Sequence, residues 1–315
     1  MNGIRVLGTG RHIPSRCVTN DDMAQIVETS DQWIQERTGI CRRHFCGEGE
    51  GNTSNAFAAA RLAMERAGVG PEDIGICVAA TFTADHGTPS LACELHHLLG
   101  LPESAPSFDV NAACTGFLHA LEAARCYLAA GDPSAPCALV VGSEVLSRVT
   151  DFTDRSTCVL FGDGAGAAVI RLDDTVPQAT VLGARGDDQV LRCPGIGQEK
   201  AYIYMDGKAV FRFAVDAFPK SIHAVLDKAG LTLEDVDHIV CHQANARIID
   251  FVIRKLKAPE EKFYKNIQDY GNTSAASIPI ALDEMVEKGI ARPGETLLLV
   301  GFGGGLTWGG TLLRL

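Results

Sequence analysis

The 315-residue sequence has no run of about 18 or more apolar residues, so it offers no segment long enough for a membrane-spanning helix. Its first residues, MNGIRVLGTGRHIP, lack the charged and then apolar layout of a secretory signal peptide. No Cys-x-x-Cys pair occurs among the 11 cysteines, and their odd number and scattered positions do not suit a disulfide framework. We therefore expect a cytoplasmic protein with reduced thiols and no membrane partner.

Positive charge is also scarce, which limits the kinds of partner. The chain has 28 Lys and Arg against 39 Asp and Glu, a formal net charge of −11, and this balance argues against general binding to nucleic acid. The stretch CRRHFC (41–46) places two cysteines around a histidine, but no second ligand cluster follows it, so no metal site is expected.

The glycine-rich loop FGDGAGAAV (161–169) raises the question of nucleotide binding. It is not followed by Lys and Ser or Thr, so a P-loop is disfavoured. It also leads into a strand-like run instead of opening a helix, which a dinucleotide-binding loop would do. No cofactor is expected, and a non-catalytic nucleotide- or CoA-binding module is the least favoured interpretation.

What the sequence does contain is an alternation of strand and helix signals. Apolar β-rich runs such as 74–80 and 137–142 are short and are bounded by Gly, Pro and Asp. The segment 114–130 has helical spacing and only two charged residues, which is typical of a central helix. Continuously apolar strands indicate sheets covered on both faces, so we predict a layered α/β fold.

An internal repeat adds to this prediction. AGVGPEDIGICV (67–78) matches AGLTLEDVDHIV (229–240), and FGDGAGAAVIRL (161–172) parallels FGGGLTWGGTLLRL (302–315), in the same order. Two such matches predict a duplicated fold packed about a pseudo-twofold axis. The N-terminal half, 1–172, would carry a nucleophilic cysteine, and the C-terminal half, 173–315, would supply the residues that act on the bound substrate.

Three polar positions are candidates for chemistry. Cys114 lies where an apolar run gives way to a helix, and a helix start favours a thiolate over a thiol. His242 directly follows the repeated strand of the second half, where its first-half counterpart is Ala80. Asn272 precedes the Ser/Thr N-cap of another helix. Each signal is weak alone, since a buried cysteine, a loop histidine and a cap are common structural features.

Four motifs in sequence order, ACTGF (113–117), HQAN (242–245), GNTSAASIP (271–279) and GFGGGLTWG (301–309), connect these positions. With them the chain resembles β-ketoacyl-acyl-carrier-protein synthase III of the thiolase-like superfamily. The resemblance implies a five-layer αβαβα fold. It also implies that Cys114, His242 and Asn272 are the catalytic triad and that Gly304 contributes to an oxyanion hole.

The same resemblance implies a condensing enzyme that begins fatty-acid synthesis. An acyl primer would pass from acyl-CoA to Cys114, whose thiolate the helix start and His242 would stabilise. Malonyl-acyl-carrier-protein would then lose CO₂, and His242 and Asn272 would donate hydrogen bonds to the enolate oxygen. Backbone N–H groups of Cys114 and Gly304 would bind the tetrahedral oxyanion, where glycine is expected because a side chain would block close approach.

Further residues carry over from the family with their expected roles. Trp33 and Arg37 would hold the adenine and phosphates of CoA with help from Arg155, and Asn245 and Gly207 would line the pantetheine tunnel. The resemblance alone implies a homodimer. Thr88 stands where acetyl-preferring relatives carry a bulky aromatic that closes the partner subunit's acyl pocket, so a deeper pocket that accepts primers longer or more branched than acetyl is expected. Independently of the resemblance, the stretch 247–265 has six Lys and Arg against three acids. It would bind the acidic carrier protein through Arg247, Arg254 and Lys255.

Some related enzymes are disfavoured and others remain open. Biosynthetic thiolases carry a second cysteine in the C-terminal glycine loop, which this chain lacks after Cys241. Elongating synthases use histidine where this chain has Asn272. Hydroxymethylglutaryl-CoA synthases need an additional acid near the nucleophile, which the sequence alone does not place. Synthase-III-like acyltransferases or condensing enzymes of secondary metabolism share all three residues and stay the main alternative.

Overall fold

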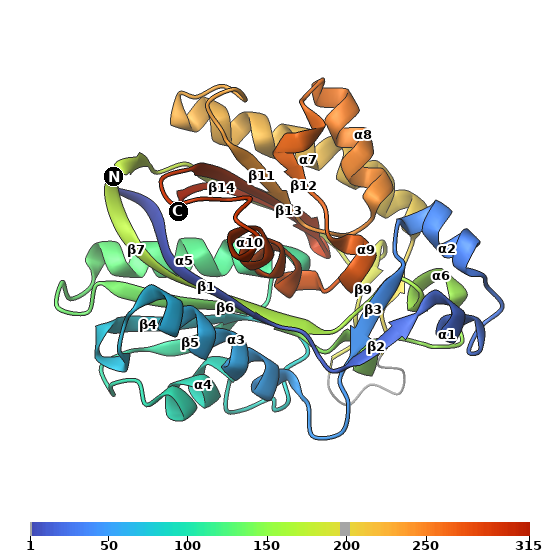
Figure 1. Ribbon diagram of the computed structural model, residues 1–315, viewed down its shortest axis with the longest axis horizontal. Coiled ribbons are helices and arrows are strands. Elements are labelled where there is room, and N and C mark those ends of the chain that lie inside the picture. The colour runs from blue at the N-terminus through green and yellow to red at the C-terminus, as the bar shows by residue number, and fades with distance from the viewer. Residues whose placement is uncertain (1, 196–201) are drawn as a thin grey trace.

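The computed structural model describes residues 2–195 and 202–315, in which helices and sheets alternate in layers (Figure 1). The strands are β1 (Asn2–His12), β2 (Arg16–Thr19), β3 (Arg42–Phe45), β4 (Ile74–Ala80), β5 (Ser107–Val110), β6 (Cys137–Glu144), β7 (Gly164–Pro177), β8 (Thr180–Asp187), β9 (Leu191–Arg192), β10 (Tyr204–Met205), β11 (His238–Cys241), β12 (Phe263–Tyr264), β13 (Thr296–Gly303) and β14 (Gly305–Arg314). The α-helices are α1 (Asn20–Ala24), α2 (Asp31–Thr38), α3 (Asn52–Ala67), α4 (Leu91–Leu99), α5 (Gly116–Ala130), α6 (Arg155–Cys158), α7 (Gly207–Ala229), α8 (Ala246–Leu256), α9 (Ile267–Tyr270) and α10 (Ser277–Glu287).

Two groups of strands repeat the same arrangement. The first runs β5-β4-β6-β7-β1 and the second β12-β11-β13-β14-β8. In each group the first three strands are parallel and the last two pairings are antiparallel. A short parallel pairing of β1 with β14, at Ile4 and Arg5, joins the groups. The predicted α/β fold of two like halves is confirmed. The boundary after residue 172 stays a prediction, and β7 continues past it to Pro177.

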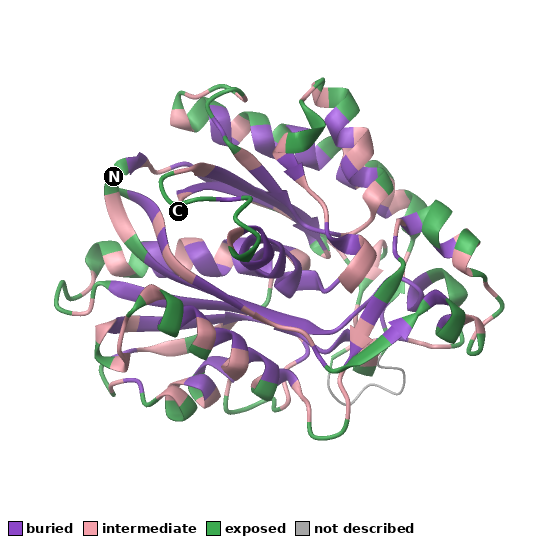
Figure 2. Ribbon diagram, viewed as in Figure 1, coloured by how far each residue is buried: buried purple, intermediate pink, exposed green. Residues whose placement is uncertain are grey.

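Helices cover both groups of strands and also separate them (Figure 1). Helices α3 and α4 pack on the outer face of the first group. Helix α7 packs on the outer face of the second group, and α8 lies beside α7 in the same apolar cluster. Helices α5 and α10 lie between the two groups and contact strands of both. Separate buried apolar clusters fill the spaces between these layers. Figure 2 accordingly shows the central strands and α10 as largely buried, while α5 is buried mainly in its first part.

The two central helices begin in equivalent turns. The 3₁₀ turn η2 (Ala113–Thr115) precedes α5, and η5 (Ser274–Ala276) precedes α10. Ala113 and Ser274 are the first residues of these turns and have left-handed backbones, with φ of 47° and 49°. Cys114 and Ala275 therefore occupy matching positions in the two halves. The turns also contact each other, so both helix starts meet in the middle of the molecule.

One end of the layered core is closed by smaller elements. Strands β2 and β3 with helices α1, α2 and α6 form a cap beside it, with its own apolar cluster (Figure 1). Gly39 ends α2 next to α8, where a Cβ would come within 2.5 Å of the Ala246 methyl group. No helix in the described ranges is both long enough and apolar enough to cross a membrane.

Candidate active site

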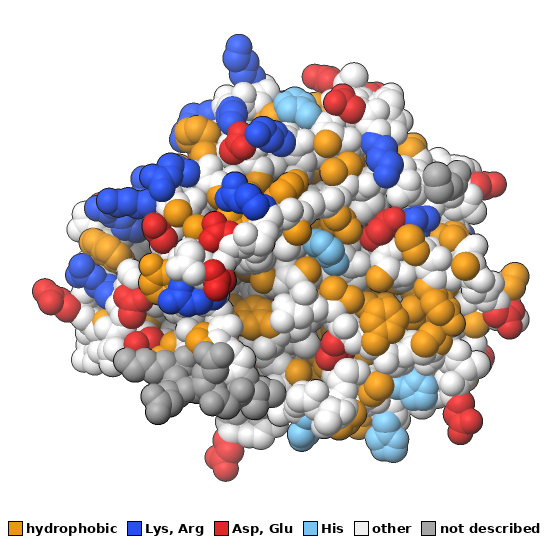
Figure 3. Space-filling model, turned by 180° about the vertical axis from the view of Figure 1, so that it is seen from behind, with side chains coloured by type: hydrophobic (Ala, Val, Ile, Leu, Met, Phe, Trp, Pro, Cys, Tyr) orange, Lys and Arg blue, Asp and Glu red, His pale blue; other side chains and the backbone are white. Residues whose placement is uncertain are grey.

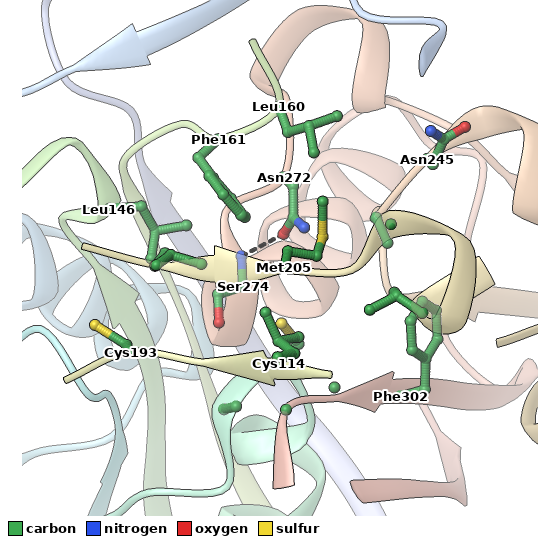
Figure 4. A pocket seen from close by; sticks show the side chains of 18 of the residues that line it. Cys114, Leu146, Leu160, Phe161, Cys193, Met205, Asn245, Asn272, Ser274 and Phe302 are labelled. Atoms are coloured by element: carbon green, nitrogen blue, oxygen red, sulfur yellow. Dashed lines mark hydrogen bonds between the residues drawn. The ribbon is translucent and has the colours of Figure 1, made fainter. Parts of the chain in front are cut away.

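A cavity of about 920 Å³ opens between the cap and the two central helix starts. It brings together residues from both halves that are up to 274 positions apart in the chain, from Trp33 to Thr307. The predicted site residues that line it are Trp33, Arg37, Cys114, Gly207, His242, Asn245, Asn272 and Gly304. Figure 4 shows Cys114, Asn272 and Ser274 around the inner part of the cavity and Asn245 farther out.

Cys114 is the middle residue of η2 and lies two residues before Gly116, the first residue of α5. Burial raises the pKa of its thiol to about 11, and the nearby Ser274 hydroxyl and the backbone N–H groups of Cys114 and Gly304 only partly oppose that rise. Near pH 7 the group is therefore a thiol in the free protein, although the helix start was expected to favour the thiolate. The donors surround the sulfur as expected, but desolvation of the charged form outweighs them.

His242 is buried at the end of β11, with an exposed fraction of 1%. Burial lowers the pKa of its imidazole to about 3, so the ring is neutral near pH 7 and does not form an ion pair with a thiolate. Ser277 Oγ accepts the Gln243 N–H at 3.1 Å and lies 2.6 Å from His242 Nδ1. We assign the donor role in this contact to the Ser277 hydroxyl, which places the imidazole proton on Nε2. Phe302 packs edge-on against the ring, 5.6 Å between centroids.

Asn272 has its side-chain amide oriented by the turn that follows it. Its Oδ1 accepts the Ser274 N–H at 2.9 Å, which leaves Nδ2 as a donor on the other side of the amide (Figure 4). Backbone hydrogen bonds from Asn272 N–H to Leu160 O and from Gly162 N–H to Asn272 O fix the residue against the loop before β7. His242 Nε2 and Asn272 Nδ2 are thus both hydrogen-bond donors at the cavity.

The glycine-rich end of β13 approaches the nucleophile from the other side. A Cβ on Gly303 would come within 2.9 Å of the Cys114 nitrogen and 3.0 Å of its Cβ. A Cβ on Gly304 would meet only Leu191 at 3.4 Å and Ala113 at 3.6 Å. Of the two glycines, Gly303 is therefore the one whose backbone lies against Cys114 within the chain, and the oxyanion-hole role of Gly304 stays a prediction.

Two threonine hydroxyls hold this loop to the nucleophile turn. Thr115 Oγ1 lies 2.8 Å from Thr307 Oγ1, and Thr307 Oγ1 lies 3.0 Å from Gly304 O and 3.3 Å from Ala112 O. The link joins the turn of the first half to the loop of the second half. It fixes the backbone N–H groups of Cys114 and Gly304 relative to each other.

The outer part of the cavity carries the residues expected at CoA. The Arg155 guanidinium lies 5.0 Å from the centroid of the Trp33 ring, and that of Arg37 lies 5.9 Å from it. Arg155 itself is not among the cavity-lining residues described, and it donates to Glu28 O at 2.9 Å. Asn245 caps α8 and donates to Arg37 O at 3.0 Å, so its side chain is already engaged in joining α8 to α2.

The remaining predicted residues lie on the surface. Thr88 is exposed in the loop between β4 and α4, away from the cavity-lining residues of its own chain that the structure describes. Arg247, Arg254 and Lys255 are exposed on α8, and Lys255 Nζ donates to Val215 O at 3.0 Å. Within 2–195 and 202–315, no group of three His, Cys, Asp or Glu side chains is arranged to hold a metal ion.

Sequence reasoning missed several residues of the cavity. Ser277 and Ser274 both lie in GNTSAASIP, but only the folded chain shows that one contacts His242 and the other faces Cys114. Apolar side chains form much of the inner wall and lie in loops and short strands without strong periodicity. They include Phe82, Leu146, Val159, Leu160, Phe161, Leu191, Ile203 and Met205.

Comparisons with known proteins agree with this site. Two family models match, described as 3-oxoacyl-[acyl-carrier-protein (ACP)] synthase III at residues 108–186 and as its C-terminal part at 226–315. The β-ketoacyl-[acyl-carrier-protein] synthase III of Clostridium acetobutylicum is 45% identical, with 100% of this chain and 99% of the relative covered. The chain belongs to the β-ketoacyl-[acyl-carrier-protein] synthase III family. It is therefore an acyltransferase that catalyses a condensation in the initiation of fatty-acid synthesis.

Solved structures of the synthase III family have the same fold. The enzyme from Aquifex aeolicus superposes with a TM-score of 0.93 at 42% identity, with 99% of this chain and 100% of that chain covered. The priming β-ketosynthase of the R1128 polyketide pathway superposes with a TM-score of 0.94 at 38% identity, with 100% and 96% covered. The predicted thiolase-like fold is confirmed.

Proposed function

We propose that Cys114 takes an acyl primer from acyl-CoA as a thioester and that the bound acyl group then condenses with malonyl-acyl-carrier-protein. The decarboxylative Claisen step would release CO₂ and yield β-ketoacyl-acyl-carrier-protein, after CoA has left in the acylation step. The observation that carries this proposal is the set of donors around one thiol: two backbone N–H groups at Cys114 Sγ, and His242 and Asn272 at the same cavity.

The donors divide between the two steps. In acylation, the N–H groups of Cys114 and Gly304 would bind the tetrahedral oxyanion. In condensation, His242 Nε2–H and Asn272 Nδ2–H would bind the oxygen of the enolate formed when malonate loses CO₂. Each well-placed donor of this kind stabilises a transition state by about 3–4 kcal/mol. A neutral imidazole suits the second role, since it donates a hydrogen bond without gaining a proton.

The test is acylation of the intact protein by acyl-CoA, followed by mass spectrometry. Cys114→Ala should give no acyl-enzyme. His242→Ala and Asn272→Ala should be acylated but should lose decarboxylation and condensation. Acylation of Cys114→Ala at the wild-type rate would refute the nucleophile. Equal acylation defects in all three variants would instead require His242 to act as the base for the thiol.

The destination of the product is a separate question. The chain is 38% identical over its whole length to a priming ketosynthase of a polyketide pathway, so a role in secondary metabolism is the second candidate. Both roles use the same chemistry. Comparing kcat/KM for malonyl groups on a fatty-acid carrier protein and on a polyketide carrier protein separates them, and a preference of tenfold or more for the polyketide carrier would overturn our first choice.

The CoA and carrier protein would approach from the cap side. Trp33 offers its indole to the adenine, while Arg37 and Arg155 offer guanidinium groups to the phosphates. Lys and Arg side chains gather where α7 and α8 lie, at the upper left of Figure 3. Arg247, Arg254 and Lys255 on α8 would bind the acidic carrier there. Gly207 and Asn245 lie between these groups and the inner cavity, where pantetheine would extend.

We propose further that the enzyme is a cytoplasmic homodimer. Apolar side chains gather at the lower right of Figure 3, where α4 and the edge strand β5 lie. Leu98 and Phe108 are 48% and 40% exposed on these elements, which a partner subunit would cover. Thr88 lies two residues before the N-cap of α4, beside this surface, and would reach the acyl pocket of the partner. Light scattering that shows a fully active monomer would overturn the dimer.

A further inference from the structure

A carboxyl group that none of these roles uses lies behind the inner cavity. Glu144 ends β6 and is completely buried. Its Oε2 accepts hydrogen bonds from Thr81 Oγ1 at 3.2 Å, from Phe82 N–H at 3.3 Å and from the Thr83 hydroxyl. Its Oε1 has no hydrogen-bond partner among the described residues. An unpaired oxygen on a buried carboxyl is costly, so one that persists needs an explanation.

The Ser274 hydroxyl stands between this carboxyl and Cys114. Its Oγ is buried and, within the described part of the chain, completes no well-formed hydrogen bond in this conformation. Burial raises the pKa of both Cys114 and Glu144, and proximity of the Ser274 hydroxyl opposes the rise in each case. Figure 4 shows Ser274 beside Cys114, with its hydroxyl directed away from the Asn272 amide. Two buried oxygens without hydrogen-bond partners are therefore near the reactive sulfur: Ser274 Oγ lies next to Cys114, and Glu144 Oε1 lies beyond it.

Acylation needs a proton acceptor, and the imidazole is a poor one. His242 has its pKa lowered to about 3 by burial, whereas burial raises the pKa of the Cys114 thiol to about 11. Burial raises the pKa of Glu144 to about 8, with the Thr83, Phe82, Thr81 and Ser274 donors opposing the rise. The pKa of Glu144 is therefore nearer to that of the Cys114 thiol than the pKa of His242 is, which makes Glu144 the better proton acceptor of the two.

The groups that face Glu144 come from several elements. Thr81 and Thr83 lie in the loop after β4, Ser274 in η5, and the thiols of Cys114 and Cys193 in η2 and after β9. The negative charge of Glu144 contributes to raising the pKa of both thiols, after burial. The two thiols are neutral near pH 7, so hydroxyl and N–H donors alone stabilise the charged form of Glu144 there.

We propose that Glu144 accepts the proton of Cys114 during acylation and that Ser274 relays it. The thiol proton passes to Ser274 Oγ, and the serine proton passes to Glu144 Oε1, as Sγ bonds to the thioester carbonyl carbon. When the tetrahedral adduct collapses, the bond from that carbon to the sulfur of CoA breaks. Protonated Glu144 then returns a proton through Ser274 to the leaving sulfur. One thiol and one thioester are consumed and one of each is formed, with no net proton change.

The experiment measures how the reactivity of Cys114 depends on pH. Alkylation by iodoacetamide, read on the peptide that contains Cys114, and acylation by acyl-CoA are each followed from about pH 6 to pH 10. In the wild type both rates should rise with a midpoint near pH 8. Glu144→Gln keeps the size of the side chain and an oxygen for its donors, but it cannot accept a proton. Its midpoint should move toward pH 11, with acylation at pH 8 about 100-fold slower.

Two further variants keep the test decisive. Ser274→Ala should show the same shift while the Thr81, Phe82 and Thr83 donors to Glu144 Oε2 stay in place. Ala113 shows that alanine fits the equivalent left-handed position. Glu284→Gln changes another buried carboxyl, bonded to Asn266, Tyr270 and Lys288 outside the lining of the cavity, and should keep the wild-type midpoint. An unshifted midpoint in either relay variant, or an equal shift in Glu284→Gln, would overturn the relay.

The inference rests on the proposed role of Cys114, and the two can fail separately. Acylation of Cys114→Ala would refute the nucleophile itself. An acylation-competent Cys114 whose pH profile is the same in wild type and in Ser274→Ala would refute only the relay. A circular dichroism spectrum and a melting curve for each variant show whether a loss of rate comes from unfolding, and Ser274→Ala decides the question if Glu144→Gln does not fold.

Discussion

Alanine at Gly303 is expected to displace the nucleophile, whereas alanine at Gly304 is not. At Gly303 the added Cβ would lie 2.9 Å from the Cys114 nitrogen, 3.0 Å from its Cβ and 3.3 Å from its Cα. These atoms belong to a backbone turn that cannot rotate out of the way, so the turn must move by several tenths of an ångström. Overpacking of this kind costs about 1–3 kcal/mol of stability. Misplacement of reacting groups by about 1 Å costs about 100-fold in rate, so we expect acylation to slow about 10- to 100-fold.

Gly304 provides a matched control one residue away. An added Cβ there would make ordinary contacts with Leu191 at 3.4 Å and Ala113 at 3.6 Å, and the backbone N–H would remain in place. Acylation of Gly304→Ala should therefore stay within about threefold of wild type. The assay is rapid-quench mass spectrometry of the acyl-enzyme at saturating acyl-CoA, with a melting curve for each variant. A Gly303→Ala enzyme that acylates normally, or a Gly304→Ala enzyme that is equally slow, would refute the reasoning.

Three further predictions concern charge, pocket width and pH. Arg247→Glu combined with Arg254→Glu should raise the KM for malonyl-carrier protein at low salt while acyl-CoA acylation is unchanged, and high salt should shrink the effect. Thr88→Phe should shift preference from butyryl-, isobutyryl- and octanoyl-CoA toward acetyl-CoA, by about fourfold in kcat/KM per buried methylene, and equal preferences in both enzymes would remove Thr88 from the pocket. The folded-state pKa of His242 lies below its unfolded value, so its contribution to stability is complete above about pH 6.5 and is lost as pH falls toward 3. Urea unfolding should therefore show the wild type losing about 3 kcal/mol relative to His242→Gln between pH 7 and pH 4.5, and parallel curves would contradict the burial argument.

Much of the fold could be predicted because it depends on local pattern. The run IGICVAA forms β4 with the same limits, and the charge-poor segment after Cys114 forms the buried helix α5. The repeat spacing of 162 residues places β11 as the counterpart of β4, and both lie second in their groups of strands. The motif resemblance also predicted that Cys114, His242 and Asn272 share one site, and the structure places all three at one cavity.

What the sequence did not reveal depends on environment and on exact placement. The helix-start argument for a thiolate at Cys114 omitted the cost of burying its charge, which is larger than the gain from the nearby donors. Adjacent glycines in one motif look alike, so only coordinates show that Gly303 is the one that approaches the turn. Ser277 lies 35 residues from His242 in the sequence. No sequence pattern predicts that a serine in the first turn of α10 contacts the imidazole and so determines which ring nitrogen carries the proton.

The left-handed residues that open the two central helices have a consequence for how this enzyme could change. Such a backbone costs about 1–3 kcal/mol for a residue other than glycine, and the chain bears that cost twice, at Ala113 and at Ser274. Only one of the two turns holds a thiol, since Ala275 stands where the other would be. The backbone strain therefore arises where the two helix starts contact each other, and it does not depend on the presence of a reactive side chain. Because packing of the two helices maintains the turn, the side chain at its middle position can be substituted without loss of the turn. A catalytic residue can therefore be gained or lost at this position while the fold is retained.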